Sequence, residues 1–342
     1  MRAAHRLPTS PARLRPVHVH IENSRAAAPV FAVTPELYAD ALRRHPWADG
    51  ILRATIGHDF EEFDAAMQTA EILLATRFPR ENLGARAPGL RWIHARGAGI
   101  DHLLPLDWRP PGVILTNNRG VHAPKAGEFA GMALLVLNNR LPLHMTNQRH
   151  ARWAQVFSTP AAGKTLMIVG VGQMGGAAAR YAKRLGLRVL GVRRNRRPHR
   201  HVDEMFGPEG FLTALGEADF VLVTVPLTSQ TRGLIGRKEL AAMKPGAGLI
   251  NMSRAGVVDY EALRERLISG GLSGAILDVF DPEPLPADSS LWATPNLIIT
   301  PHVSSDDAAQ YIPRTLDQFF ENLHRYLTNR PLRNRVDPAT EY

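Results

Sequence analysis

The stretch from Thr165 to Gly176, TLMIVGVGQMGG, constrains the fold of this chain more than any other. An apolar run ends at Gly170 and opens the pattern Gly170-x-Gly172-x-x-Gly175, after which a helix-like segment begins. Gly170 allows a tight turn, Gly172 lets backbone approach a phosphate group, and Gly175 lets the helix pack close to the strand. The start of the helix adds free N–H donors and a positive dipole end. Because the glycines lie between a strand and a helix, we favour a dinucleotide site over an ordinary turn.

The composition is that of an ordinary globular protein. The 342 residues are 44% hydrophobic and 21% charged, and this length favours two domains. No apolar run approaches the roughly 20 residues of a membrane span, so we expect no membrane contact. The chain has no cysteine, which excludes thiol catalysis, disulfides and cysteine-ligated zinc, and we expect no metal site.

The N-terminal segment, Met1 to Pro16, is rich in arginine, free of acidic residues and without an apolar centre. A secretory signal is therefore not expected, because such a signal needs an apolar core. The prolines and the lack of periodicity favour a disordered tail at 1–15 over an organelle transit peptide. We expect a cytoplasmic protein.

The basic charge raises the question of a nucleic-acid partner. Lys and Arg number 41 against 32 Asp and Glu, which gives a formal net charge of +9. The excess is concentrated in the first fifteen residues, between Arg193 and Arg200, and after Arg330. We find no basic face interleaved with aromatic residues and no nucleic-acid motif, so we predict no nucleic-acid partner.

Strand and helix patterns alternate through the first part of the chain. The segment Thr34-Pro35-Glu36 is typical of a helix start, since a capping residue is followed by proline. Apolar strand patterns occur at 17–22, 51–56, 71–76, 90–95 and 113–118, and helix-like patterns at 36–45 and 59–70. This alternation predicts parallel strands with helices on both faces.

A long helical pattern, from Ala123 to Trp153 with a break near Pro142, separates this unit from the glycine motif. Its segment 128–139 is apolar nearly all round, so we expect it to be buried between domains or subunits. From the glycine motif onward, six apolar strands predict a dinucleotide-binding sheet, at 166–169, 187–192, 219–226, 248–253, 274–280 and 296–302. Residues 306–329 predict an amphipathic helix, and residues 331–342 an extended tail.

Four groups of residues follow strands of these sheets, and ligands of open α/β sheets gather at such strand ends. The groups are Asn251 to Gly256, Asp278 with Glu283, His302, and Gly97 to Gly99. Each alone has a structural explanation as a cap, a turn residue or a loop histidine. Together they supply a permanent cation, a carboxylate and a titratable imidazole, which hydride transfer to a carbonyl requires.

The motifs GVGQMG, NMSRAGVVD, LDVFDPEPLP and NLIITPH, in this order and spacing, resemble the D-isomer-specific 2-hydroxyacid dehydrogenase family. RGAGIDHLL and VPLTSQTRGLIG fit the same family, and the resemblance extends from about Val17 to the C-terminal helix. It implies an α/β fold of two doubly wound parallel-sheet domains, with a Rossmann-type coenzyme domain inserted into a flavodoxin-like substrate domain. The resemblance implies a substrate domain at 16–118 and 303–342, an NAD(P)-binding domain at 119–302, and an active site in the cleft.

The resemblance also implies three catalytic residues. Arg254 would bind the substrate carboxylate and polarise the carbonyl, His302 would exchange a proton with the substrate oxygen, and Glu283 would hold the imidazole. The chemistry of these side chains agrees, because the planar guanidinium matches a carboxylate and stays charged. A carboxylate beside a histidine favours the imidazolium form, which keeps a general acid available.

Binding residues follow from the same resemblance. The backbone N–H groups of Gly97, Ala98 and Gly99 would receive the substrate carboxylate together with Arg254. Asp278 would orient the nicotinamide carboxamide. The other residues expected around the coenzyme are Gly170, Gly172, Gln173, Met174, Gly175, Val225, Pro226, Thr231, Met252 and Ser253.

One position departs from NAD-binding sheets, in which an acidic residue about 20 residues past the glycines bonds the ribose 2′-hydroxyl. The strand 187–192 here runs into Arg193-Arg194-Asn195-Arg196-Arg197. Arginine favours a 2′-phosphate, which an acidic residue would repel. We therefore expect NADP as the preferred coenzyme, bound by Arg193 and Arg194, and NAD as the second candidate. The alternative is a solvated charged loop.

These observations predict an NAD(P)H-dependent reductase of a small 2-keto acid, of the glyoxylate or hydroxypyruvate type, that acts as a homodimer. Two alternatives stay open: a nucleotide-sensing protein similar to related corepressors, and the same chemistry on a larger 2-hydroxy acid. The set of Arg254, Glu283 and His302 favours an enzyme. The sequence leaves open the direction of Arg96, which precedes the glycines at 97–99.

Overall fold

The computed structural model describes residues 14–342, and the tail predicted at 1–15 lies almost entirely outside this range. Backbone contacts divide the chain into two compact units. Unit 1 comprises the described part of Met1–Gly97 with Pro105–Asn118 and Ile312–Val336, and unit 2 comprises Ala98–Leu104, Arg119–Tyr311 and Asp337–Tyr342. These bounds differ from the predicted domains at 98–104, 303–311 and 337–342, and the predicted domains stay a prediction.

Unit 1 is built on a five-stranded parallel sheet in the order β2-β1-β3-β4-β5. This is the strand order of flavodoxin-like doubly wound sheets, as predicted. The central strand β1 is buried at all its positions, because it pairs with a strand on each side. The strands are β1 (Val17–Asn23), β2 (Leu52–His58), β3 (Ile72–Ala75), β4 (Trp92–Ala95) and β5 (Ile114–Thr116).

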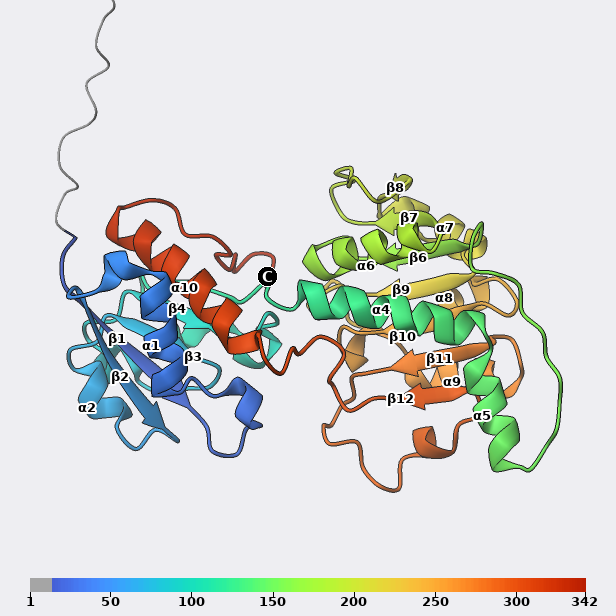
Figure 1. Cartoon of the computed structure of the whole chain (residues 1–342), viewed down its shortest axis with the longest axis horizontal. Coiled ribbons are helices and arrows are strands. Elements are labelled where there is room, and N and C mark those ends of the chain that lie inside the picture. Colours follow the sequence, from blue (N-terminus) through green and yellow to red (C-terminus); the bar gives the residue numbers. More distant parts are fainter. Residues whose placement is uncertain (1–13) are drawn as a thin grey trace, which may run out of the picture. The chain divides into compact units, whose positions relative to one another are not determined.

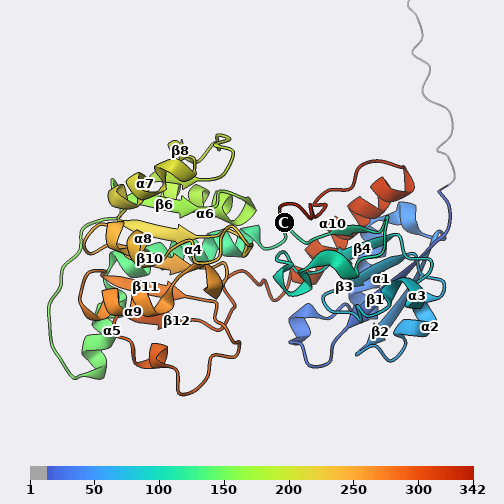
Figure 2. The same ribbon diagram turned by 180° about the vertical axis from the view of Figure 1, so that it is seen from behind.

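Helices cover both faces of this sheet. In Figure 1, α1 (Pro35–Arg44) and α10 (Tyr311–Leu327) lie over one face, and Figure 2 shows the unit from the side of α2 (Phe63–Met67) and α3 (Leu83–Arg86). The start of α1 is as predicted, since the Thr34 side chain accepts a hydrogen bond from the backbone of Leu37. On the α10 face, the rings of Trp92 and Phe319 stack with their centroids 5.2 Å apart.

Two predicted helices of unit 1 are shorter than expected. The pattern at 59–70 gives helix only at Phe63–Met67, because Asp59 and Phe60 take positive φ angles of 53° and 68°. The C-terminal helix begins at Tyr311 rather than at 306, because the Asp307 side chain bonds the next backbone N–H groups in a turn. The C-terminal tail, predicted to be extended over 331–342, instead forms turns at 333–334 and 338–341.

Unit 2 carries a seven-stranded parallel sheet in the order β12-β11-β10-β9-β6-β7-β8. Counted from the glycine motif, this order is 3-2-1-4-5-6 with one more strand, which is the Rossmann arrangement. The sequence predicted six of these strands and missed β8, an edge strand of three residues. The strands are β6 (Thr165–Val169), β7 (Arg188–Val192), β8 (Glu204–Phe206), β9 (Phe220–Val223), β10 (Gly248–Asn251), β11 (Gly274–Leu277) and β12 (Leu297–Ile299).

Alternate side chains of β6 enter two cores, one on each face of the sheet. Leu166 and Ile168 pack with α4 (Ala123–Asn138) and α6 (Gln173–Arg184), which lie in front in Figure 1. Met167 and Val169 pack on the other face, which is covered by α7 (Phe211–Glu217), α8 (Arg237–Ala242) and α9 (Tyr260–Ile268). Unit 2 is therefore a three-layer α/β sandwich.

The long helical pattern forms two helices, α4 and α5 (Leu141–Arg149), with the break near Pro142 as predicted. Within this chain α4 is not buried on every side, since Met132 and Leu135 are 48% and 41% exposed, and its burial between domains or subunits stays a prediction. The helix is closely packed toward α6, where a side chain at Gly127 or Gly131 would crowd the ring of Tyr181, and toward the sheet, where one at Gly248 would crowd Leu137.

Short 3-10 helices complete the chain, namely η1 (Pro29–Phe31), η2 (Pro46–Ala48), η3 (Asp101–Leu103), η4 (Leu106–Trp108), η5 (Pro208–Gly210), η6 (Ala255–Val257) and η7 (Ser290–Ala293). Across residues 14–342, none of the helices combines the length and the apolar character that crossing a membrane would need.

Candidate active site

The glycine motif forms a tight turn between β6 and α6. Gly170 takes a φ of +97°, and its carbonyl oxygen accepts a 2.7 Å hydrogen bond from the Thr224 hydroxyl. A side chain at Gly175 would collide with the Gly170 carbonyl, whereas the space around the Cα of Gly172 is open. Helix α6 begins directly after Gly172, so its first N–H groups lie beside this open space. The turn is therefore shaped to receive a phosphate group.

The arginines after β7 do not all face the same partners. Arg193 donates from Nη1 to the carbonyl of Arg197, and Arg194 donates from Nη1 to Gln230 Oε1 at 3.1 Å. Arg196 forms an ion pair with Glu209. Arg194 thus reaches the loop after β9, which also contains the predicted coenzyme residues Val225, Pro226 and Thr231. Arg196 instead pairs with the Glu209 carboxylate.

The loop after β9 is braced from within. The Thr231 hydroxyl donates to the Pro226 carbonyl at 2.6 Å and accepts from the Thr228 backbone at 2.8 Å. Of the two predicted residues after β10, Met252 packs into the core between the sheet and α4, and Ser253 is also buried. Sequence patterns gave no reason to single out Gln230, which contacts Arg194 only through the fold.

Arg254 is oriented by a buried turn at the end of β10. The Asn251 carboxamide accepts from the backbone and the hydroxyl of Ser253, and it donates to the Arg254 carbonyl. It also donates to the Tyr260 hydroxyl, which in turn donates to the Val279 carbonyl. Burial raises the pKa of the Tyr260 phenol above its usual range, so this hydroxyl stays protonated.

The guanidinium of Arg254 meets the segment that follows Gly97. Its Nε donates to Asp101 Oδ1 at 3.0 Å, and its Nη1 donates to the Ser253 carbonyl at 2.8 Å. A side chain at Gly99 would overlap the guanidinium at Nη2. Ala98, Gly99 and Arg254 thus belong to one site in unit 2, and Gly97 is the last residue of that segment of unit 1.

The structure brings together His302 and Glu283, the two residues predicted to handle the proton. His302 Nδ1 lies 2.8 Å from Glu283 Oε2, and Nδ1 donates because an ionised carboxylate only accepts. Glu283 Oε1 also accepts from the backbone of Phe280 at 2.8 Å, which fixes the carboxylate. Both side chains are partly exposed. With Nδ1 occupied, Nε2 is the nitrogen left to face a ligand.

Asp278 follows β11 and is buried beneath the His302 segment. Its carboxylate accepts from the Thr300 hydroxyl at 2.6 Å, from the Val303 backbone at 3.0 Å, and from the Ser304 backbone at 3.0 Å. No pattern in the sequence indicates these three bonds. The family resemblance implies a different role for Asp278, in which it orients the nicotinamide carboxamide.

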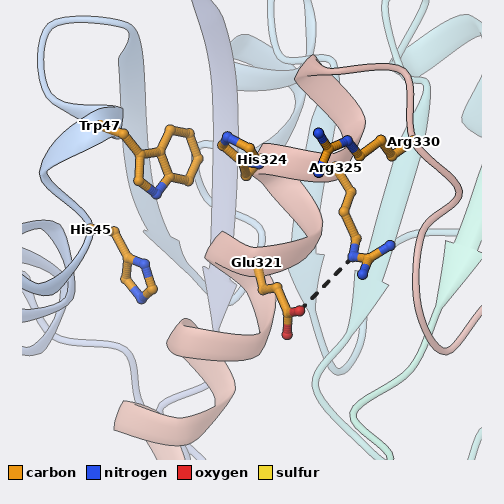
Figure 3. Close-up of a pocket in the computed structure, with 6 residues that line it drawn as sticks. All are labelled: His45, Trp47, Glu321, His324, Arg325 and Arg330. Atoms are coloured by element: carbon orange, nitrogen blue, oxygen red, sulfur yellow. Dashed lines mark ion pairs between the residues drawn. The ribbon is translucent and has the colours of Figure 1, made fainter. Parts of the chain in front are cut away.

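A hollow of about 360 Å³ lies on unit 1, and none of the predicted site residues lines it. Figure 3 shows its six residues, which come from α10, from the chain just after it, and from the segment after α1. The Trp47 and His324 rings meet edge to face there, with centroids 5.0 Å apart. Among residues 14–342, no group of three or more His, Asp or Glu side chains is arranged to hold a metal ion.

Comparisons with known proteins show which family this chain is similar to. The family model described as D-isomer specific 2-hydroxyacid dehydrogenase, NAD binding domain, matches residues 131–304. A glyoxylate reductase from Thermococcus litoralis is 36% identical over 247 residues, which cover 69% of this chain and 74% of that protein.

Solved structures show the same fold. A D-isomer specific 2-hydroxyacid dehydrogenase from Xanthobacter autotrophicus Py2, in complex with NADPH and MES, has a TM-score of 0.82 at 30% identity and covers 96% of this chain and 100% of its own. An NADPH-dependent glyoxylate/hydroxypyruvate reductase from Sinorhizobium meliloti, in complex with NADP and sulfate, has a TM-score of 0.77 at 27% identity. It covers 95% of this chain and 100% of its own.

Proposed function

The chain belongs to the D-isomer specific 2-hydroxyacid dehydrogenase family, and from this premise we propose that it reduces a small 2-keto acid to a D-2-hydroxy acid with NADPH. The observation that carries the proposal is the 2.8 Å contact of His302 with Glu283, in the same unit as Arg254 and the glycine turn. We propose glyoxylate or hydroxypyruvate as the substrate type, because the similar proteins are named for these acids.

The glycine turn fits a dinucleotide coenzyme. Any side chain at Gly175 would fill the place where the helix meets the turn, and the open space at Gly172 leaves room for a pyrophosphate. Gln173 and Met174 open the helix beside it, so their N–H groups are available to phosphate oxygens. Bound coenzyme would supply the hydride that reduces the keto carbon.

Arg254 holds the substrate in this proposal. Its Nε and Nη1 are engaged by Asp101 and the Ser253 carbonyl, which leaves Nη2 to meet a substrate carboxylate next to the backbone of Ala98 and Gly99. The same cation polarises the carbonyl, because it lies where negative charge develops on the oxygen. The charge of the guanidinium does not depend on pH in the working range.

His302 supplies the proton. As hydride reaches the keto carbon, Nε2 protonates the carbonyl oxygen and prevents an alkoxide from accumulating. Glu283 accepts the bond from Nδ1 and so keeps the ring in the orientation that presents Nε2. In the reverse reaction, the oxidation of the 2-hydroxy acid, the same two residues carry out these steps in the opposite order.

We propose that the protein is a homodimer joined through α4, α5 and the segment that follows them. Trp153 and Phe157 are 94% and 87% exposed, and they lie between α5 and β6 where the chain forms no helix or strand (Figure 1). Met132 and Leu135 on α4 are also exposed. Exposed apolar side chains are typical of interfaces between proteins, and two-fold dimers are the commonest assembly. We propose the cytoplasm as the compartment.

The test is turnover by the purified full-length chain. NADPH oxidation is followed by absorbance with glyoxylate, hydroxypyruvate, pyruvate and phenylpyruvate, and each acid is repeated with NADH. Consumption of NADPH with the small acids supports the proposal. Tight NADPH binding without turnover of any acid would instead identify a nucleotide sensor. A preference for phenylpyruvate would keep the chemistry and overturn the substrate size.

A further inference from the structure

We propose that Asp278 is a positioning residue, which fixes the backbone segment from Thr300 to Ser304 and through it the orientation of the His302 ring. The inference rests on the proposed function for the role of His302. It differs from the role implied by family resemblance, in which the same carboxylate orients the nicotinamide carboxamide.

The first observation is the burial of the carboxylate. Asp278 is 1% exposed, and an ionised carboxylate removed from water is costly unless its oxygens are hydrogen-bonded. Here three donors compensate it: Oδ1 accepts from the Thr300 hydroxyl and the Val303 backbone, and Oδ2 accepts from the Ser304 backbone. The bond from Thr300 is short at 2.6 Å, as is typical of a hydroxyl that donates to an ionised acceptor.

The second observation is where these donors lie in the chain. Thr300 precedes His302, whereas Val303 and Ser304 follow it, so one carboxylate ties together the two sides of the histidine. The segment is anchored to the sheet on its near side, since the Thr300 backbone donates to the Leu277 carbonyl at 3.0 Å. Asp278 itself follows β11, so the segment is fixed to the strand that neighbours β12.

The third observation is the backbone conformation of His302. Its φ is 54°, in the left-handed region that residues with a side chain seldom adopt. Such a conformation persists only where the surroundings hold it. The three bonds to Asp278 bracket this residue, and the His302 backbone N–H adds a 3.0 Å bond to the Thr300 carbonyl. Without the carboxylate, the segment is free to relax and carry Nε2 away from the substrate oxygen.

The coenzyme role and the positioning role predict different results. A carboxylate has about four lone-pair sites, and three of those of Asp278 are taken within the chain. If the carboxylate acts on the carboxamide, its removal matters only when the coenzyme carries an amide N–H. If it acts through His302, the loss is the same whichever coenzyme is bound.

The experiment compares Asp278→Asn with wild type using NADPH and its reduced 3-acetylpyridine analogue, which has a methyl ketone in place of the carboxamide. We expect kcat to fall roughly ten- to hundredfold with both coenzymes, because a small displacement of a catalytic group has such an effect. The dissociation constant of NADPH, measured by fluorescence, should stay within about threefold. A fall in kcat that disappears with the analogue would overturn the proposal.

Two further variants separate positioning from general damage. Thr300→Val removes one donor to Asp278 and should lower kcat by a smaller factor, without changing NADPH binding. Thr294→Val is the matched control, because this buried hydroxyl donates to the Ser290 carbonyl and does not contact Asp278. Its kcat should be unchanged. Equal losses in both threonine variants would refute the positioning role.

A readout without turnover keeps the two proposals distinguishable. Hydrogen–deuterium exchange of the peptide that spans 300–304, measured without coenzyme, should lose protection in Asp278→Asn and keep it in Thr294→Val. Unchanged protection in Asp278→Asn overturns the positioning role even if the wild type is an active reductase. If Asp278→Asn loses protection but the wild type shows no turnover, the positioning role of Asp278 is supported and only the proposed function is rejected.

Discussion

Coenzyme choice is the property that a small change in the loop after β7 should alter most. We predict that wild-type protein prefers NADPH, and that Arg193→Asp combined with Arg194→Ala weakens its use of NADPH. Both side chains follow the strand whose end meets the ribose in sheets of this order. The chemical step should remain, because neither residue belongs to the site of Arg254 and His302.

The magnitude follows from the number and exposure of the contacts. A charge-assisted hydrogen bond contributes about 1.5–3 kcal/mol, and solvent exposure reduces that by roughly half. Two such bonds to a 2′-phosphate then give about 1.5–3 kcal/mol, or roughly 10- to 150-fold in the ratio of kcat/KM for NADPH to that for NADH. The bond that Arg194 makes to Gln230 is to a neutral side chain, so a phosphate that replaced Gln230 would be the stronger partner.

The assay is kcat/KM for both coenzymes at moderate and at high salt, because exposed charges are screened. Arg196→Ala is the matched control: it removes the same charge from the same loop, but this guanidinium is paired with Glu209. The control should keep most of the NADPH preference. Equal kcat/KM values for the two coenzymes in the wild type would refute the reasoning, and so would an equal loss in Arg196→Ala.

Three other predictions concern catalysis, assembly and stability. His302→Ala should lower kcat by about a hundredfold to ten-thousandfold while NADPH still binds, as steady-state kinetics and fluorescence titration would show; near-normal turnover would reject its role as the acid. Light scattering should give the mass of a dimer for the wild type, and Trp153→Ser with Phe157→Ser should shift it toward the monomer. Burial lowers the pKa of His94 to about 4, from an ordinary 6.5. The folded state then excludes a proton that the unfolded chain binds, so stability is full above about pH 6.5 and falls by up to about 3 kcal/mol toward pH 4. Chemical unfolding across this range should show the slope in wild type and a flatter one in His94→Phe.

Much of the fold could be predicted because it is encoded over short distances in the chain. The apolar run before Gly170 and the helix after Gly172 mark a strand and a helix whatever surrounds them. The same is true of the Thr34 cap. Strand β8 could not be found in this way, because three residues at a sheet edge carry no periodic signal. The turn at Asp59 and Phe60 also interrupts a pattern that reads as helix.

The residues of the candidate site could be predicted from the sequence, but the contacts that hold them could not. The sequence determined which residue types stand at the strand ends, because parallel strands bring their carboxyl ends to one edge and the motifs name Arg254, Glu283 and His302. It could not determine what holds them. The Asp101–Arg254 bond joins residues 153 positions apart. Such a contact depends on how distant elements pack, and no local pattern records it.

Side-chain direction is the other property that only the tertiary structure decided. Arg96 stands beside the substrate-binding glycines in the sequence, yet it is buried and donates to Asn23 Oδ1 and to the carbonyls of Glu22 and Phe31. Arg196 stands among the coenzyme arginines, yet it pairs with Glu209. The buried Arg96 needs these partners because an unpaired charge is costly to bury, whereas the exposed Arg196 pairs with a carboxylate that the fold places within reach. The amino-acid sequence determines the charge of each side chain, and the packing of the chain determines which partner that side chain contacts.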